Sequence, residues 1–239
     1  MPRQNRVNPF GELIATESRG TWMGNRGCLH DGEQHIRRPF AGRRWIICVL
    51  EFRGRHRTIM APGRYTELFF LDEATALAAG HRPCAECQRT RYRLFRELWA
   101  ASNPGLIDAL PRGREWKTSA LCADEIDRIL HLERVNDERG KRTYLAPVPE
   151  LPTGVVVADG EGTPYLVLDR RLMQWEPGGY TRSVSKPANV LFRVLTPKSI
   201  VRTIAQGYPV VVHPSAGRES EDQPARHAGH QPGDEARGA

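Results

Sequence analysis

Apolar and β-branched residues alternate with turn residues in the first part of the chain. Residues 45–52 form an almost continuous apolar run, which predicts a buried strand. Similar but shorter segments predict strands at 11–18, 57–60 and 65–70, separated by turns rich in Gly, Pro and Arg. We therefore expect a small sheet in this part of the protein.

The pattern changes to a helical period after residue 71. Asp72 is a suitable N-cap for the Ala-rich segment 73–79, and Gly80 is expected to end that helix. Apolar residues with helical spacing also predict a helix over 123–133.

The segment 88–101 has the clearest amphipathic pattern of the chain. Its apolar residues recur three or four positions apart, and its other side carries several Arg residues. We expect Tyr92 and Trp99 to lie on the packed side of this helix, because they share the apolar face.

Short strands with frequent turns return after residue 140, followed by a helix predicted at 199–205. The composition therefore predicts an α+β fold with a small N-terminal α+β module over 1–140 and a small β-rich unit over 141–214. Residues 215–239 lack large apolar side chains and are expected to form a disordered tail.

Composition limits the classes of protein to consider. The 239-residue chain has no apolar run long enough to span a bilayer and no apolar segment typical of a secretory signal. Five cysteines, an odd number, fit a reducing compartment better than a disulfide framework. We expect a cytoplasmic protein that does not enter membranes.

The positive charge is concentrated in the first hundred residues. Residues 1–100 contain 17 Arg and no Lys against 10 acidic residues, a net charge of +7, whereas the remainder is neutral. Clustered Arg residues suit phosphate backbones, although a general preference for Arg over Lys is an alternative explanation. The candidate phosphate contacts are Arg37, Arg38, Arg43, Arg44, Arg89 and Arg93.

Cys84 and Cys87 form a Cys-x-x-Cys knuckle behind Gly80 and Pro83. Two thiols at this spacing in a tight turn can bind one tetrahedral metal ion, and Zn²⁺ is the expected cofactor. A pair of reduced thiols without metal is the alternative.

A structural zinc site needs two further ligands. Cys28 and His30, in a Gly-rich segment, are the best candidates, and His30 could instead act as a base. Cys48 and Cys122 compete with them, but their apolar neighbours indicate core positions. Further candidates for the fourth ligand are Asp31, His35, His56 and His81.

The segment 69–87, an acidic and Ala-rich helix followed by Gly-His-Arg-Pro-Cys-Ala-Glu-Cys, resembles the second half of the zinc-binding domain of Ada-type DNA methylphosphotriester repair proteins. The resemblance implies zinc binding and contact with DNA. In that family a Cys-x3-Cys pair upstream of the knuckle supplies the thiolate that accepts the methyl group. No such pair occurs here, and Cys28 precedes Cys84 by 56 residues.

The chain as a whole also looks like members of an uncharacterised bacterial family. The shared segments are 23–27, 79–84 and 207–216, and this second resemblance implies no activity.

The sequence therefore predicts a zinc-stabilised protein that binds nucleic acid, DNA rather than RNA, with a link to DNA repair or modification. Two alternatives stay open. One is an enzyme acting on nucleic acid, by alkyl transfer through Cys28 or by hydrolysis with His30. The other is a metal-stabilised module for protein interaction. The sequence does not predict the oligomeric state.

Overall fold

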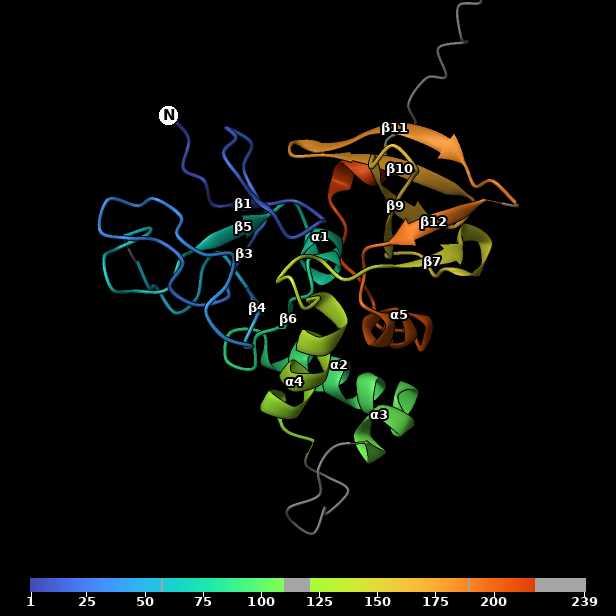
Figure 1. Cartoon of the computed structure of the whole chain (residues 1–239), viewed down its shortest axis with the longest axis horizontal. Helices are drawn as coiled ribbons and strands as arrows, with labels where there is room; N and C mark the ends of the chain where they lie inside the picture. Colours follow the sequence, from blue (N-terminus) through green and yellow to red (C-terminus); the bar gives the residue numbers. More distant parts are fainter. Residues whose placement is uncertain (57, 110–120, 189, 218–239) are drawn as a thin grey trace, which may run out of the picture.

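The computed structural model describes residues 1–56, 58–109, 121–188 and 190–217. Helices are combined with two six-stranded sheets, which confirms the predicted α+β class. Figure 1 shows the first sheet in blue and teal, the second in yellow and orange, and most of the helices gathered beside them.

The first sheet is built from short strands of the N-terminal part, in the order β2-β1-β5-β3-β4-β6. Its strands pair antiparallel except for β1 with β5 and β4 with β6, which pair in parallel. The strands are β1 (Arg6–Val7), β2 (Leu13–Ile14), β3 (Trp22–Asn25), β4 (Ile46–Cys48), β5 (Leu68–Phe70) and β6 (Arg82–Pro83).

The second sheet is antiparallel and has the order β11-β10-β9-β8-β12-β7. A 3₁₀ helix, η1 (Val148–Glu150), follows its first strand. The strands are β7 (Tyr144–Pro147), β8 (Val156–Ala158), β9 (Pro164–Leu168), β10 (Arg171–Glu176), β11 (Gly179–Ser185) and β12 (Leu191–Val194).

One short helix lies between the two sheets, and the longer helices lie together on one side of them (Figure 1). Helix α2 contacts α5, and α4 also contacts α5, so the last helix joins elements that are distant in sequence. The helices are α1 (Glu73–Ala78), α2 (Arg89–Ser102), α3 (Pro104–Asp108), α4 (Ala123–Arg134), α5 (Lys198–Ala205) and the 3₁₀ helix η2 (Pro214–Gly217).

Helix α1 begins at the predicted cap and is buried along its whole length. Oδ1 of Asp72 accepts hydrogen bonds from the backbone N–H of Thr75 at 2.8 Å and from its hydroxyl at 2.7 Å. Gly80 follows the helix with φ at 90°, a conformation that favours glycine. The Ala-rich composition therefore lets a helix fit where larger side chains would not.

A continuous hydrophobic core joins the two predicted units. It includes Phe95 and Trp99 of α2 together with Val157 and Ile200 of the C-terminal part. Tyr92 is also buried, so α2 packs the face that its periodicity predicts. The β-rich unit thus shares its core with the N-terminal module.

Two expectations need correction. Residues 58–60 form no strand, because Met60 adopts a φ of 57° and its backbone N–H donates to Glu67, while residue 57 lies outside the described part. Residues 215–217 belong to η2, and the Ser215 hydroxyl accepts the backbone N–H of Tyr180 at 2.7 Å. The rest of the predicted tail, 218–239, lies outside the described residues.

None of the helices in the described ranges is both long and apolar enough to cross a lipid bilayer.

Candidate metal centre

The knuckle of Cys84 and Cys87 follows strand β6 and is held against strand β4. The backbone N–H of Cys84 donates to the carbonyl of Ile47 at 2.9 Å, and Nε2 of Gln88 donates to the same carbonyl at 2.7 Å. The backbone N–H of Glu86 donates to the Cys84 sulfur at 3.4 Å. The protein's own hydrogen bonds therefore fix the turn that presents the two thiols.

A third thiol, Cys48, comes from the neighbouring strand. Strands β4 and β6 pair in parallel, with Ile47 opposite Pro83. Because side chains alternate along a strand, Ile47 enters the core while Cys48 faces the other side. In the described ranges, one group of His, Cys or acidic side chains lies close enough together to hold a metal ion. It consists of Cys48, Cys84 and Cys87, whose sulfur atoms lie within 4.8 Å of one another.

The three thiols influence one another's ionisation. Hydrogen bonding from Cys48 and Cys87 lowers the pKa of the Cys84 thiol far below its usual value. Hydrogen bonds with Cys84 and Cys87 raise the pKa of the Cys48 thiol, and burial and repulsion by the neighbouring thiolates raise it further. A bound cation removes this repulsion, so the cluster fits a thiolate-binding metal ion.

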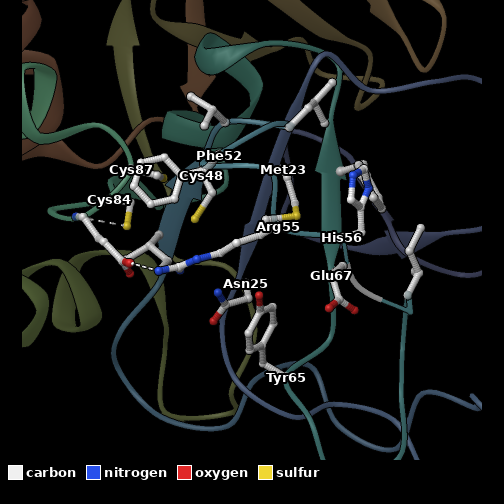
Figure 2. A pocket seen from close by; sticks show the side chains of 16 residues that line it. Met23, Asn25, Cys48, Phe52, Arg55, His56, Tyr65, Glu67, Cys84 and Cys87 are labelled. Atoms are coloured by element: carbon white, nitrogen blue, oxygen red, sulfur yellow. Dashed lines mark hydrogen bonds and ion pairs between the residues drawn. The ribbon is translucent and has the colours of Figure 1, made fainter.

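The thiol cluster forms part of the wall of a cavity of about 430 Å³. Figure 2 shows the sulfur atoms of Cys48 and Cys84 beside the Phe52 ring, with Arg55 crossing the cavity. Arg55 pairs with Glu86 at 2.8 Å. Other polar side chains that reach the cavity are Asn25, His56, Tyr65 and Glu67. The volume lies within the range of small-molecule sites.

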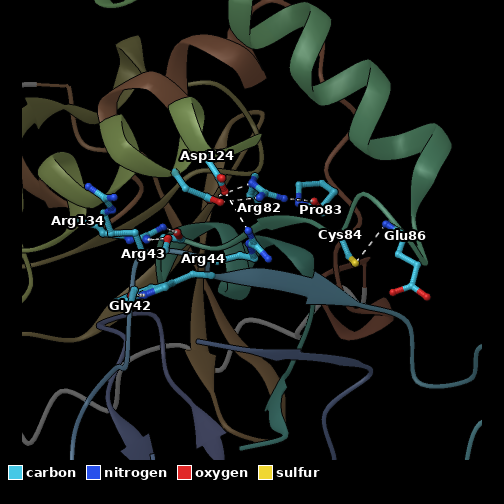
Figure 3. Close-up of polar contacts among 12 residues, drawn as sticks. Gly42, Arg43, Arg44, Arg82, Pro83, Cys84, Glu86, Asp124 and Arg134 are labelled. Carbon is cyan, nitrogen blue, oxygen red and sulfur yellow. Dashed lines mark hydrogen bonds and ion pairs between the residues drawn. The ribbon is translucent and has the colours of Figure 1, made fainter. Parts of the chain in front are cut away.

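A buried ion pair supports the knuckle from the opposite side. Arg82, two residues before Cys84, donates from Nε and Nη2 to the two carboxylate oxygens of Asp127 at 2.9 and 2.6 Å. Both side chains are almost fully buried, at 2% and 3% exposure. Figure 3 shows Arg82 and Pro83 leading directly into Cys84. Helix α4 therefore helps to position the thiols of the knuckle through this pair.

The structure does not bring Cys28 and His30 into the thiol cluster. The Cys28 thiol donates to the carbonyl of His30 at 3.7 Å. His30 is buried, with Nε2 at 3.2 Å from the carbonyl of Ala61 and Nδ1 at 2.6 Å from the Thr66 hydroxyl. Both ring nitrogens are thus engaged, which leaves His30 no nitrogen for a metal or for a base in hydrolysis.

The remaining candidate ligands lie in different surroundings. Buried His81 packs edge-to-face against Phe70 and at a tilt against Trp45, and desolvation lowers its pKa well below the usual value. Asp31 pairs with Arg37 and lies beside exposed His35. Among these predicted candidates, His56 lines the cavity.

Two cysteines were misplaced by the sequence interpretation. Cys122 is exposed at the N-cap of α4, where its backbone N–H donates to Glu125 at 2.8 Å, and so it is not a core residue. Cys48 is buried but belongs to the thiol cluster. Ile46, Ile47 and Cys48 belong to a continuous apolar run, so the local sequence carries no signal that separates Cys48 from the core.

All six predicted phosphate contacts are exposed, and two of them also form ion pairs with acidic side chains. Arg37 and Arg44 are exposed but form ion pairs with Asp31 and Asp124. The other four are exposed, namely Arg38, Arg43, Arg89 and Arg93. Arg89 and Arg93 are one turn apart on α2, immediately after the knuckle.

Comparison with known proteins gives no further guidance, because no family model, curated protein or solved structure matches this chain.

We predict one bound metal ion per chain in protein purified without chelators, held through Cys48. Cys48→Ser should remove it, because the centre has only three thiol ligands in the described residues. Metal content by mass spectrometry with element detection measures the result.

Cys28→Ser is the matched control, because its thiol lies outside the cluster and should leave the metal content unchanged. Loss of the ion in this variant, with retention in Cys48→Ser, would contradict the assignment.

Asp127→Ala should destabilise the protein by about 3–5 kcal/mol, because it leaves the buried Arg82 charge without its partner. Asp124→Ala on the same helix removes an exposed pair with Arg44 and should cost about 1 kcal/mol or less. Urea denaturation of both variants gives the two free energies of unfolding, and equal losses would show that the buried pair has no special role.

Proposed function

We propose that Cys48, Cys84 and Cys87 bind Zn²⁺ as thiolates and leave its fourth coordination position facing the adjoining cavity. The observation that carries this proposal is that all three cysteines line the cavity. In the described residues no fourth His, Cys or carboxylate joins their group. Structural zinc sites normally have four protein ligands, whereas sites that act on a ligand keep one position open.

Nucleic acid is the proposed partner of this centre. Arg89 follows the metal ligand Cys87 by two residues and shares an exposed face of α2 with Arg93. Arg55 lines the cavity, with its guanidinium group 5.2 Å from the centre of the Phe52 ring, and the guanidinium group of Arg53 lies 5.0 Å from the centre of the same ring. Such cations suit a phosphate backbone passing beside the cavity.

In this role zinc would activate its thiol ligands as well as stabilise the fold. A bound zinc ion keeps coordinating thiols deprotonated and therefore nucleophilic. The polar side chains on the far side of the cavity, Asn25, Tyr65 and Glu67, could orient a ligand by hydrogen bonds. The arrangement supports a centre that meets its ligand in the cavity.

Alkyl transfer is a second candidate function, favoured by the position of the thiols at the cavity wall together with the resemblance to methylphosphotriester repair proteins. A cluster thiolate would attack the methyl carbon of a phosphotriester. The carbon–oxygen bond would break, and the oxygen would keep its electrons as a phosphodiester anion. The cluster replaces Cys28 in this proposal, because Cys28 lies outside the group.

Binding to a DNA duplex should weaken steeply as salt rises, because phosphate contacts release counterions. The double variant Arg89→Gln, Arg93→Gln should lower the slope of log affinity against log salt by about two. Fluorescence anisotropy at several salt concentrations measures both quantities.

Arg170→Gln, an exposed change in the turn between β9 and β10, is the charge-matched control at one site and should keep the slope. An affinity that does not depend on salt would remove the support for a nucleic-acid partner, while leaving the zinc proposal to its own test of metal content.

The alkyl-transfer candidate predicts that incubation with methylphosphotriester DNA adds one methyl group to Cys48, Cys84 or Cys87. Peptide mass spectrometry would locate the adduct, and Cys28→Ser should be methylated as fully as the wild type. Zinc-loaded protein that gains no methyl group, or gains it on Cys28, would refute transfer by the cluster.

A further inference from the structure

A second cavity, of about 50 Å³, is lined by cationic side chains and lies away from the thiol cluster. Arg26, Arg134, Arg139 and Lys141 all line it. No carboxylate is found in its lining, which otherwise consists of aromatic, aliphatic and Gly residues. The charges in this cavity are therefore of one sign.

Two of these cations are buried and incompletely hydrogen-bonded. Arg26 and Arg134 are 2% and 1% exposed, and in the described structure the Nε atom of each has no hydrogen-bond partner. Their guanidinium groups lie 4.7 and 4.0 Å from the centre of the Trp45 ring. Burial lowers the pKa of both side chains to about 9, which reflects the cost of keeping them charged.

The hydrogen bonds that Arg26, Arg134 and Lys141 donate here go to neutral backbone carbonyl groups. Arg26 donates to the carbonyl of Gly11 at 2.7 Å, and Arg134 donates to the carbonyl of Gly80 at 2.7 Å. Lys141 donates to the carbonyl of Ala78, and burial lowers its pKa to about 7.

The Asp127 carboxylate, which stabilises the charge of Arg134, is hydrogen-bonded to another cation, Arg82. Asp127 raises the pKa of Arg134, yet both of its oxygens accept hydrogen bonds from Arg82. One carboxylate thus serves two buried guanidinium groups, and Arg26 and Lys141 add two more cations nearby. Buried charges without partners are strongly unfavourable, so a further negative charge is expected.

We propose that this cavity binds an oxyanion of the phosphate class. Guanidinium groups present several N–H donors in a plane that matches phosphate oxygens. The cavity of about 50 Å³ has room for about two water molecules at the roughly 30 Å³ that each takes in the liquid, so only a small oxyanion suits it. Arg139 and Gly140 at its rim are exposed, which gives access from solvent.

Arg139 is the cation of this site that is best suited to a test by substitution. It adopts a φ of 64° in the turn after α4 and places its guanidinium 4.7 Å from the centre of the Phe40 ring. Because it is exposed, it can be changed without opening the core. The phosphate can be a free ion or belong to a nucleotide or nucleic acid, and the site does not depend on the metal centre.

The test is calorimetric titration of the full chain with inorganic phosphate in a phosphate-free buffer at constant ionic strength. We expect saturable binding of one phosphate per chain with a Kd of about 1 mM or tighter. Arg139→Gln should weaken binding about tenfold, the loss typical of a hydrogen bond to a charged group. Arg170→Gln, on the turn between β9 and β10, is the charge-matched control and should bind as the wild type does.

Lys141→Met is the second variant and should abolish or strongly weaken binding while retaining the fold, because a half-buried cation is replaced by an apolar chain of similar length. Competition by an oligonucleotide carrying a 5′-phosphate, but not by its unphosphorylated form, would identify a terminal phosphate as the source. Competition by neither would identify free phosphate. The proposal is overturned if wild-type protein gives no saturable heat, or if Arg139→Gln and Arg170→Gln bind phosphate equally well.

Discussion

The two buried carboxylates at the start of helix α1 organise the centre of the molecule. Oδ2 of Asp72 accepts the Tyr180 hydroxyl at 2.7 Å and the backbone N–H of His213 at 2.9 Å. Glu73 accepts the Tyr208 hydroxyl at 2.7 Å and pairs with Arg91. Desolvation raises the pKa of Glu73, so these partners are needed to keep a charge in the core. Helix α1 is thereby joined to strand β11 of the second sheet, to helix α2 and to the segment after α5.

The two candidate sites depend on the same pair of strands. Trp45, just before β4, packs against the guanidinium groups of the cationic cavity, and Cys48, at the end of β4, belongs to the thiol cluster. On the neighbouring strand, Arg82 connects to Asp127 on the side of α4, while Cys84 follows as a member of the thiol cluster. A shift in the register of β4 against β6 would therefore disturb both sites at once.

Local signals in the sequence were sufficient for helices α1, α2, α4 and α5 and for two of the three thiols in the cluster, but not for the short helix α3. The cap at Asp72, the amphipathic pattern of α2 and the spacing of Cys84 and Cys87 each depend on neighbouring residues, and the structure bears out the helices. The third thiol depends on strand pairing across 36 positions, which spacing alone does not reveal. His30 looked available because its neighbours are small, yet Thr66 and Ala61 engage both its nitrogens. Such partners are set by tertiary structure.

The hydrogen bonds to Asp72 and Glu73 also impose an order on biosynthesis. The partner N–H groups of Val211 and His213 lie 138 and 141 residues after the carboxylates they reach. During translation, these hydrogen bonds cannot form until nearly the whole described chain has been synthesised, and the two carboxylates lack these partners until then. Loop closure of this length is slow compared with local folding. The helix next to the knuckle therefore gains these two partners only after the segment that contains Val211 and His213 has been synthesised.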